Sequence, residues 1–306
     1  MKLKTIATYF TAAVVLGVLA GCATSGGTAG EPDAVSPDLP ADTAVVQIEQ
    51  TGGFVTAQTN FNRVPDLVVY ADGRAITQGA QIMIYPPPAL SSLQVAQLSA
   101  AQIERIIDVA DDAGLLEDDI DYGEPGISDA TTTVVTIIAG DTTYVHEAYA
   151  LAGVGSDDEA ALPGLDDANI EARKVLTSFI TEATVIAGSG EAGEVAVWEP
   201  EAYSLQATPV PPTSTDGTES TDGTEGTEGV EGSEGEMFGP AVAWDLTDVD
   251  LSLAATCIAV EGDTAVQLRE QLAAANMLTR FDQAGTEYEV WTRPVLPGET
   301  ACALAG

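Results

Sequence analysis

Residues 131–149 read TTTVVTIIAGDTTYVHEAY, and this stretch decides the fold class. Two runs rich in β-branched residues, Thr131–Ala139 and Thr142–Tyr149, stand on either side of Gly140-Asp141. β-Branched side chains favour strands, and a Gly-Asp pair is typical of a tight turn between two strands. The stretch therefore predicts a β-hairpin, and the neighbouring segments are expected to pack against the sheet that contains it.

Helices are predicted on both sides of this hairpin. Ser99 and Gln102 have the spacing of a capping box, and Gly114 marks the expected end of the first helix. Asp166 or Asp167 is expected to begin the second helix. Each helix has an apolar face, formed by Ile103, Ile106, Ile107 and Ala110 in the first and by Ile170, Leu176, Phe179, Ile180 and Ala183 in the second.

Strands are also predicted before the first helix. They span residues 45–50, 66–70, 75–77 and 81–85, with a turn signal at Ala71-Asp72-Gly73-Arg74. The order of strands, helix, strands and helix predicts an α+β fold. We expect a mixed or antiparallel sheet with helices packed on one face.

The C-terminal part predicts a smaller α/β module. A strand that contains Cys257 is followed by a helix, which Asp263 is expected to cap and which runs to about Ala275. Thr286–Arg293 then forms a strand rich in tyrosine, valine and tryptophan, with Tyr288 and Trp291 expected in the core. A module of about 70 residues buries little apolar surface, so a covalent link would help to stabilise it.

The cysteines offer such a link. Cys257 and Cys302 both fall in the C-terminal module, and an exported chain meets an environment that permits disulfides. A disulfide between them would stabilise the module by ~3–4 kcal/mol in the chain-entropy model. Metal binding by the pair is the weaker alternative, because a closed zinc site needs four ligands.

The third cysteine completes an export signal. Lys2 and Lys4 precede an apolar stretch from Ile6 to Leu19, and Leu19-Ala20-Gly21-Cys22 follows. A positive start, a short apolar region and small residues before a cleavage site are typical of a secretory signal. Leu-Ala-Gly-Cys matches the lipobox of bacterial lipoproteins, which implies that Cys22 is lipidated and becomes the mature N-terminus. The alternative is a plain secretory signal or a short membrane helix.

Two low-complexity stretches divide the rest of the chain. The first is rich in glycine, serine and proline and predicts a flexible tether, and the second repeats Thr-Asp-Gly-Thr-Glu units and predicts a disordered acidic linker. The predicted parts are a signal peptide (1–21), the lipidated cysteine and tether (22–43), an α+β domain (44–208), the linker (209–237) and the C-terminal module (238–306).

The charge of the chain excludes some partners. Without Lys2 and Lys4, eight basic residues remain against 48 acidic ones, so the formal charge of the mature chain is about −40. Such a field repels nucleic acid and anionic lipid headgroups. The simpler interpretation is that the charge keeps the protein soluble. The alternative is that it attracts cations or a basic partner.

The sequence offers little catalytic chemistry. His146 is the single histidine and lies within a predicted strand, where packing is a better interpretation than a catalytic triad. No nucleophile elbow, zinc-protease motif, phosphate-binding loop or dinucleotide fingerprint is present. We therefore expect no catalytic residues and no cofactor. A weak calcium candidate is the acidic loop with Asp118, Asp119 and Asp121, although a solvated loop is the simpler interpretation.

One segment has the composition of a docking element. Tyr85 is followed by Pro86, Pro87 and Pro88, and an aromatic residue beside a short polyproline run can contact a partner. The alternative is a rigid exit from a strand.

The chain resembles a family of uncharacterised actinobacterial envelope lipoproteins. The resemblance lies in the lipobox and in five further motifs, and it implies no known activity. These motifs are Thr51-Gly52-Gly53-Phe54, Pro65–Arg74 (a strand that runs into Tyr-Ala-Asp-Gly-Arg), Ala113-Gly114-Leu115-Leu116, Asp121-Tyr122-Gly123 and Thr292-Arg293-Pro294-Val295-Leu296-Pro297-Gly298 with the closing Cys302. A looser likeness, in Thr51–Phe54 and the element order, is to emfourin-type metalloprotease inhibitors.

These observations predict a lipid-anchored protein on the outer face of the cell membrane. We expect a non-enzymatic binding protein with an envelope protein or another ligand as its partner, and the oligomeric state stays open. The alternatives are a protease inhibitor similar to emfourin and a hydrolase that acts through carboxylates.

Overall fold

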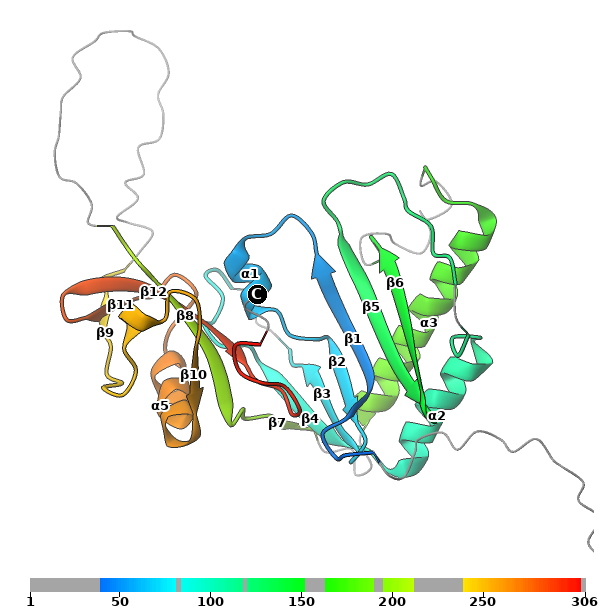
Figure 1. Cartoon of the computed structure of the whole chain (residues 1–306), viewed down its shortest axis with the longest axis horizontal. Helices are drawn as coiled ribbons and strands as arrows, with labels where there is room; N and C mark the ends of the chain where they lie inside the picture. The colour runs from blue at the N-terminus through cyan, green and yellow to red at the C-terminus, as the bar shows by residue number, and fades with distance from the viewer. Residues whose placement is uncertain are drawn as a thin grey trace, which may run out of the picture. The chain divides into compact units, whose positions relative to one another are not determined.

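The computed structural model describes residues 39–80, 84–117, 120–151, 163–189, 195–211 and 239–303. Within these ranges the chain forms two sheets, each accompanied by helices (Figure 1). The signal peptide, Cys22, most of the tether and nearly all of the acidic linker lie outside the described residues. In the described ranges, no helix has both the length and the apolar character that a membrane span requires.

The first sheet has seven strands in the order β6-β5-β1-β2-β3-β4-β7, and every pairing is antiparallel. The predicted hairpin is confirmed, because β5 pairs with β6 from Thr132↔Tyr149 to Ala139↔Thr142. Gly140 in its turn has a φ of +57°, which glycine adopts without strain. The strands are β1 (Ala44–Gly52), β2 (Leu67–Tyr70), β3 (Arg74–Gln78), β4 (Leu93–Gln97), β5 (Thr131–Ala139), β6 (Thr142–Tyr149) and β7 (Val195–Val197).

Two helices, α2 (Ala100–Asp112) and α3 (Asp167–Ser189), cover one face of this sheet (Figure 1). Ser99 and Gln102 form the predicted capping box, since each side chain bonds the backbone N–H of the other residue. Asp166 caps α3 by accepting from the backbone N–H of Asn169 at 2.9 Å. The buried faces of α2 and α3 pack on β1 and β5, so the α+β fold with helices on one face is confirmed.

The opposite face of the first sheet is covered in part by the end of the chain. Leu296 is buried there in a cluster with Val68, Tyr70 and Ile76, and Trp198 packs against the same cluster. Apolar burial of this kind explains why residues 293–298, singled out in the sequence as a motif, lie where they do. We call residues 293–302 the C-terminal segment.

The second sheet has five strands in the order β10-β8-β12-β11-β9, antiparallel except for the β9–β11 pair. Its strands are β8 (Ala202–Pro209), β9 (Val242–Ala243), β10 (Ile258–Glu261), β11 (Arg280–Gln283) and β12 (Thr286–Pro294). β8 comes before the expected linker and the other four strands come after it, so the sheet combines parts of the chain from both sides of the linker. The sequence did not suggest this arrangement, because strand pairing over that distance leaves no local signal.

Helix α5 (Gly262–Leu272) packs its Ala265, Leu268 and Leu272 against the core of the second sheet. The sequence predicted Asp263 as the N-cap of α5, and this was wrong. The N-cap is Glu261, which makes no side-chain cap bond, and Asp263 lies in the first turn. A 3₁₀ turn at Leu251–Leu253 precedes β10. Cys257 and Cys302 form the predicted disulfide, with their Cα atoms 5.7 Å apart.

The predicted strand over residues 81–85 is not supported where it can be followed. Residues 81–83 lie outside the described residues, and Ile84 and Tyr85 are not in a strand. The prolines that follow cannot donate to a ladder, so the next strand, β4, begins only at Leu93. A short helix, α1 (Ala57–Asn62), was also missed; its first turn is capped by Thr56.

Removing the disulfide tests its contribution to stability. The Cys257→Ser/Cys302→Ser double variant is expected to lower the free energy of unfolding by roughly 4 kcal/mol, because the bridge closes a loop with a sequence separation of 45. Urea denaturation followed by tryptophan fluorescence measures the difference. An unchanged midpoint and slope relative to wild type would show that the bridge does not constrain the unfolded chain.

Candidate functional site

In the acidic loop proposed for calcium, only Asp121 is among the described residues, and its contacts are to the backbone and side chains of the fold. Asp118 and Asp119, two of the three calcium candidates, lie outside the described residues. The carboxylate of Asp121 accepts from the backbone N–H of Gly123 at 2.8 Å, and its carbonyl accepts from the amide of Asn169 at 3.1 Å. Among the residues that the structure describes, no group of three or more His, Cys, Asp or Glu side chains is placed to hold a metal ion.

An open hollow of about 1070 Å³ lies beside this loop. Its lining includes four carboxylates, from Asp121, Glu124, Asp129 and Glu147. Arg173 of α3 is fully buried and donates from Nη1 to the carbonyl oxygens of Tyr122 (3.3 Å) and Tyr149 (3.0 Å), two residues that line the hollow. Arg173 thereby fixes the loop to the end of β6, and the hollow beside it has an acidic lining.

His146 is part of the core. Its side chain is 3% exposed, and both ring nitrogens have partners: Nδ1 lies 3.0 Å from the Tyr122 hydroxyl and Nε2 lies 2.8 Å from the Leu115 carbonyl oxygen. Because a carbonyl oxygen only accepts, Nε2 is the donor in that bond. Burial also raises the pKa of Tyr122. The interpretation of His146 as a packed strand histidine is confirmed.

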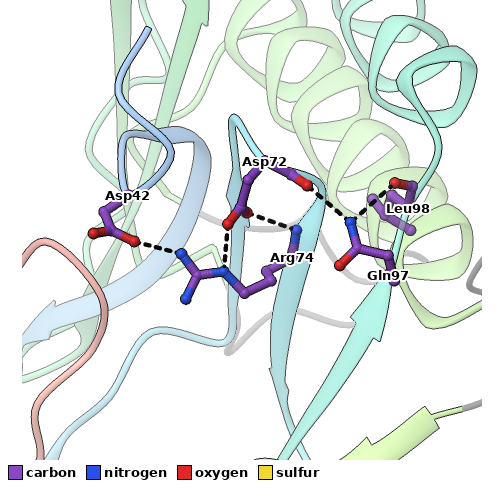
Figure 2. A network of polar contacts seen from close by, with 5 residues as sticks. All are labelled: Asp42, Asp72, Arg74, Gln97 and Leu98. Carbon is purple, nitrogen blue, oxygen red and sulfur yellow. Dashed lines mark hydrogen bonds and ion pairs between the residues drawn. The ribbon is translucent and has the colours of Figure 1, made fainter.

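A polar network orders the turn between β2 and β3 (Figure 2). Arg74 forms ion pairs with Asp42 and Asp72, and Asp72 also accepts from the Arg74 backbone N–H at 3.0 Å. Gln97 donates to the carbonyl oxygen of Asp72 at 2.8 Å. A Cβ at Gly73 would collide with the carbonyl oxygen of Leu98, so only glycine fits there. The Tyr-Ala-Asp-Gly-Arg motif therefore has a structural role.

The segment Tyr85–Pro88 is bonded to the rest of the fold at its end and exposed at its start. Pro87 accepts from the backbone N–H of Met277 at 2.9 Å, and Pro88 forms an isolated β-bridge with Asn276. These bonds fix the segment to the loop before β11. Tyr85, in contrast, is 75% exposed.

A groove of about 560 Å³ lies beside Pro87 and Pro88. We call it the α1–β12 groove, because Asn62 at the end of α1 and Trp291 of β12 both line it. Of the docking candidates, Pro87 and Pro88 are among its lining residues and Tyr85 and Pro86 are not. Trp291 is half-buried in the groove wall rather than in the core, whereas Tyr288 is buried as expected.

Two polar atoms of the groove residues stand out. The side-chain oxygen Oδ1 of Asn62 and the indole nitrogen Nε1 of Trp291 are both shielded from solvent, and neither has a hydrogen-bond partner within the described part of the chain. Shielded polar groups without partners are rare in folded proteins, since each costs about 1–3 kcal/mol. Trp244 shows the usual arrangement, because its Nε1 donates to the carbonyl oxygen of Val249 at 3.0 Å.

Comparison with protein-family models, curated proteins and solved structures finds no match for the chain. The resemblance to actinobacterial envelope lipoproteins and the looser likeness to emfourin-type inhibitors therefore remain predictions. Phe54, which ends the motif shared by both, is 87% exposed on the loop between β1 and α1.

Asn62 was not predicted as a site residue and Trp291 was predicted in the core, whereas both line the groove. Neither has a local signature, because the groove joins residues about 230 positions apart in the chain. Only the prediction of a docking element at Tyr85–Pro88 pointed to the groove, because Pro87 and Pro88 belong to its lining.

Replacing His146 tests its structural role. His146→Ala is expected to lower the free energy of unfolding by about 2–4 kcal/mol, because it leaves the Leu115 carbonyl and the Tyr122 hydroxyl without partners and opens a cavity. The exposed neighbour Glu147→Ala, measured by the same denaturation assay, should change stability by no more than about 0.5 kcal/mol. Equal, small effects of the two substitutions would contradict the packed role.

Proposed function

We propose that this chain is a lipid-anchored, non-enzymatic binding protein on the outer face of the cytoplasmic membrane. Cys22 is the lipidated residue, and the low-complexity residues that follow it tether the folded part. Because a single acyl chain binds membranes only marginally, stable anchoring by this route needs more than one chain on the cysteine.

The α1–β12 groove is the observation that carries the binding role. It combines apolar residues such as Pro87, Pro88 and Val290 with polar ones such as Gln78, Ser91 and Ser92. Binding sites are typically apolar hollows with a few fixed polar groups that orient the ligand. The groove has this combination, whereas the hollow beside Asp121 is lined mainly by polar and acidic groups.

The charge of the groove lining differs from that of the chain. Arg63 lies in its lining, but its Nη1 already donates to the carbonyl oxygens of Gln50 (3.1 Å) and Gly52 (3.0 Å). The net charge of −38 belongs to the chain as a whole, whereas the described lining of the groove contains no carboxylate. An uncharged ligand, such as an uncharged segment of an envelope protein, is therefore the partner that these features support.

Substitution of the lipobox cysteine tests the location. Cys22→Ser is expected to move the protein from the membrane fraction to the soluble extracytoplasmic fraction, because no acyl chain is then attached. Cell fractionation with immunoblotting measures the distribution.

The matched control is Ser25→Ala, which changes a neighbouring tether residue and leaves the lipobox intact. It should keep the protein in the membrane fraction. If Cys22→Ser stays in the membrane fraction like the control, the protein is not anchored through a lipid on this residue.

A further inference from the structure

The strand register of the first sheet shows which side chains point away from its helices. Ile48, Val135 and His146 lie side by side on β1, β5 and β6, and all three are buried. Ile48 and Val135 belong to the core that α2 and α3 share with the sheet. Successive side chains of a strand point to opposite faces, so the residues on either side of these three point away from the helices.

We call this outward surface of β1, β5 and β6 the open face. Val145 at its edge is 54% exposed, and Glu147 is exposed as well. The C-terminal segment packs on the same side of the sheet, but at the neighbouring strands β2 and β3. Within the described ranges, β5 and β6 therefore keep this face open to solvent. Its two central rows, set by the register, are Glu49–Val134–Glu147 and Gln47–Thr136–Val145.

The open face is acidic as well as apolar. Glu49 and Glu147 stand on the two sides of Val134, about 10 Å apart, because two strand spacings separate them. In the part of the chain that the structure describes, neither carboxylate forms an ion pair. Burial raises the pKa of Glu49, so its charged form is poorly solvated and a nearby cation would stabilise it. Glu147 also lines the acidic hollow, which extends the negative surface past the edge of β6.

This chain itself supplies few groups that could pair with these carboxylates. Neither low-complexity stretch, residues 23–43 and 209–237, contains a lysine or an arginine. A second copy offers hardly more, because each of the seven arginines already bonds to carboxylates or backbone carbonyls of its own chain, which leaves Lys174. Two copies with a net charge of −38 each also repel one another.

The remaining features favour another protein over a lipid or a small molecule. Carboxylates repel the phosphates of anionic headgroups, so a lipid surface does not complement Glu49 and Glu147. Small ligands bind in hollows that enclose them, whereas the two rows lie on an extended strand surface. A folded protein can cover such a surface, with apolar contacts over Val134 and Val145 and basic side chains on both sides of Val134.

We propose that the open face docks a basic protein. Lysine or arginine side chains of this partner pair with Glu49 and Glu147, and its apolar side chains cover Val134 and Val145. The inference goes beyond the proposed function, because the open face is a second surface that does not depend on the α1–β12 groove.

A photo-crosslinking side chain on the open face tests the docking. Benzoylphenylalanine replaces Val145 in the full chain, expressed in its native cells, and the adducts formed on irradiation are digested and identified by mass spectrometry. The matched control places the same group at Val185 of α3, which is 66% exposed. We expect Val145, and not Val185, to crosslink to a protein whose attached segment contains lysine or arginine.

Charge variants then test the two carboxylates against the purified partner. Glu49→Gln/Glu147→Gln removes both charges and keeps the side-chain shape. It is expected to weaken binding, measured by calorimetry, roughly 2- to 30-fold, the range of two exposed ion pairs. The matched control, Glu104→Gln/Glu171→Gln, removes the same charge from exposed positions of α2 and α3 and should bind as wild type does.

The other outcomes contradict the proposal. An adduct of Val145 with a second copy of this chain, or with phospholipid, would assign the open face to another occupant. No adduct, or the same adducts from Val145 and Val185, would show that the face is not a docking surface. Equal binding by the two double variants would show that Glu49 and Glu147 do not recognise the partner.

The proposed function is tested separately by the same crosslinker at Met277, a residue of the α1–β12 groove that is 39% exposed. An adduct at Met277 with none at Val145 would overturn the docking of a basic protein and leave the groove as a binding site. An adduct at Val145 with none at Met277 would support the open face and count against the groove.

Discussion

The guanidinium of Arg293 makes the contact on which the arrangement of the groove depends. Its Nε donates to the backbone carbonyl of Arg63 at 2.9 Å, and its two terminal nitrogens form ion pairs with Glu299 at 2.6 and 2.8 Å. The Arg293 side chain is 7% exposed. A charge this well buried needs a fixed partner, so the contact joins β12 to the chain after α1 and turns the C-terminal segment back on itself. Asn62 and Trp291 lie within two residues of its ends, which is why they line the same groove.

Several neighbouring features reinforce this contact. Leu296 is buried against the first sheet, and a Cβ at Gly298 would come within 2.7 Å of the carbonyl oxygen of Asp42. The disulfide holds Cys302 to Cys257 at the other end of the segment. Together they hold the C-terminal segment against the first sheet at Leu296 and to Cys257 at its other end, so residues 293–298 serve the packing of the fold.

Local sequence patterns were sufficient to predict those elements that depend on residues close together in the chain. The hairpin at residues 131–149, the capping box at Ser99 and the disulfide all depend on neighbouring residues or on composition, and each is confirmed. β8 was not recognised, although Tyr203, Leu205 and Ala207 alternate with polar residues, because it stands just before the low-complexity linker and pairs with β10 and β12, which lie beyond that linker. The groove could be predicted only through Pro87 and Pro88, since Asn62 and Trp291 meet through tertiary contacts alone.

Hydrogen exchange of wild type and Arg293→Met, measured by mass spectrometry, tests the role of Arg293 most directly. Faster exchange is predicted on both sides of the contact, in residues 57–66 and in β12, while the β5–β6 hairpin at the far edge of the first sheet keeps its protection. Faster exchange confined to β12, with residues 57–66 unchanged, would contradict the coupling of α1 to β12 through Arg293.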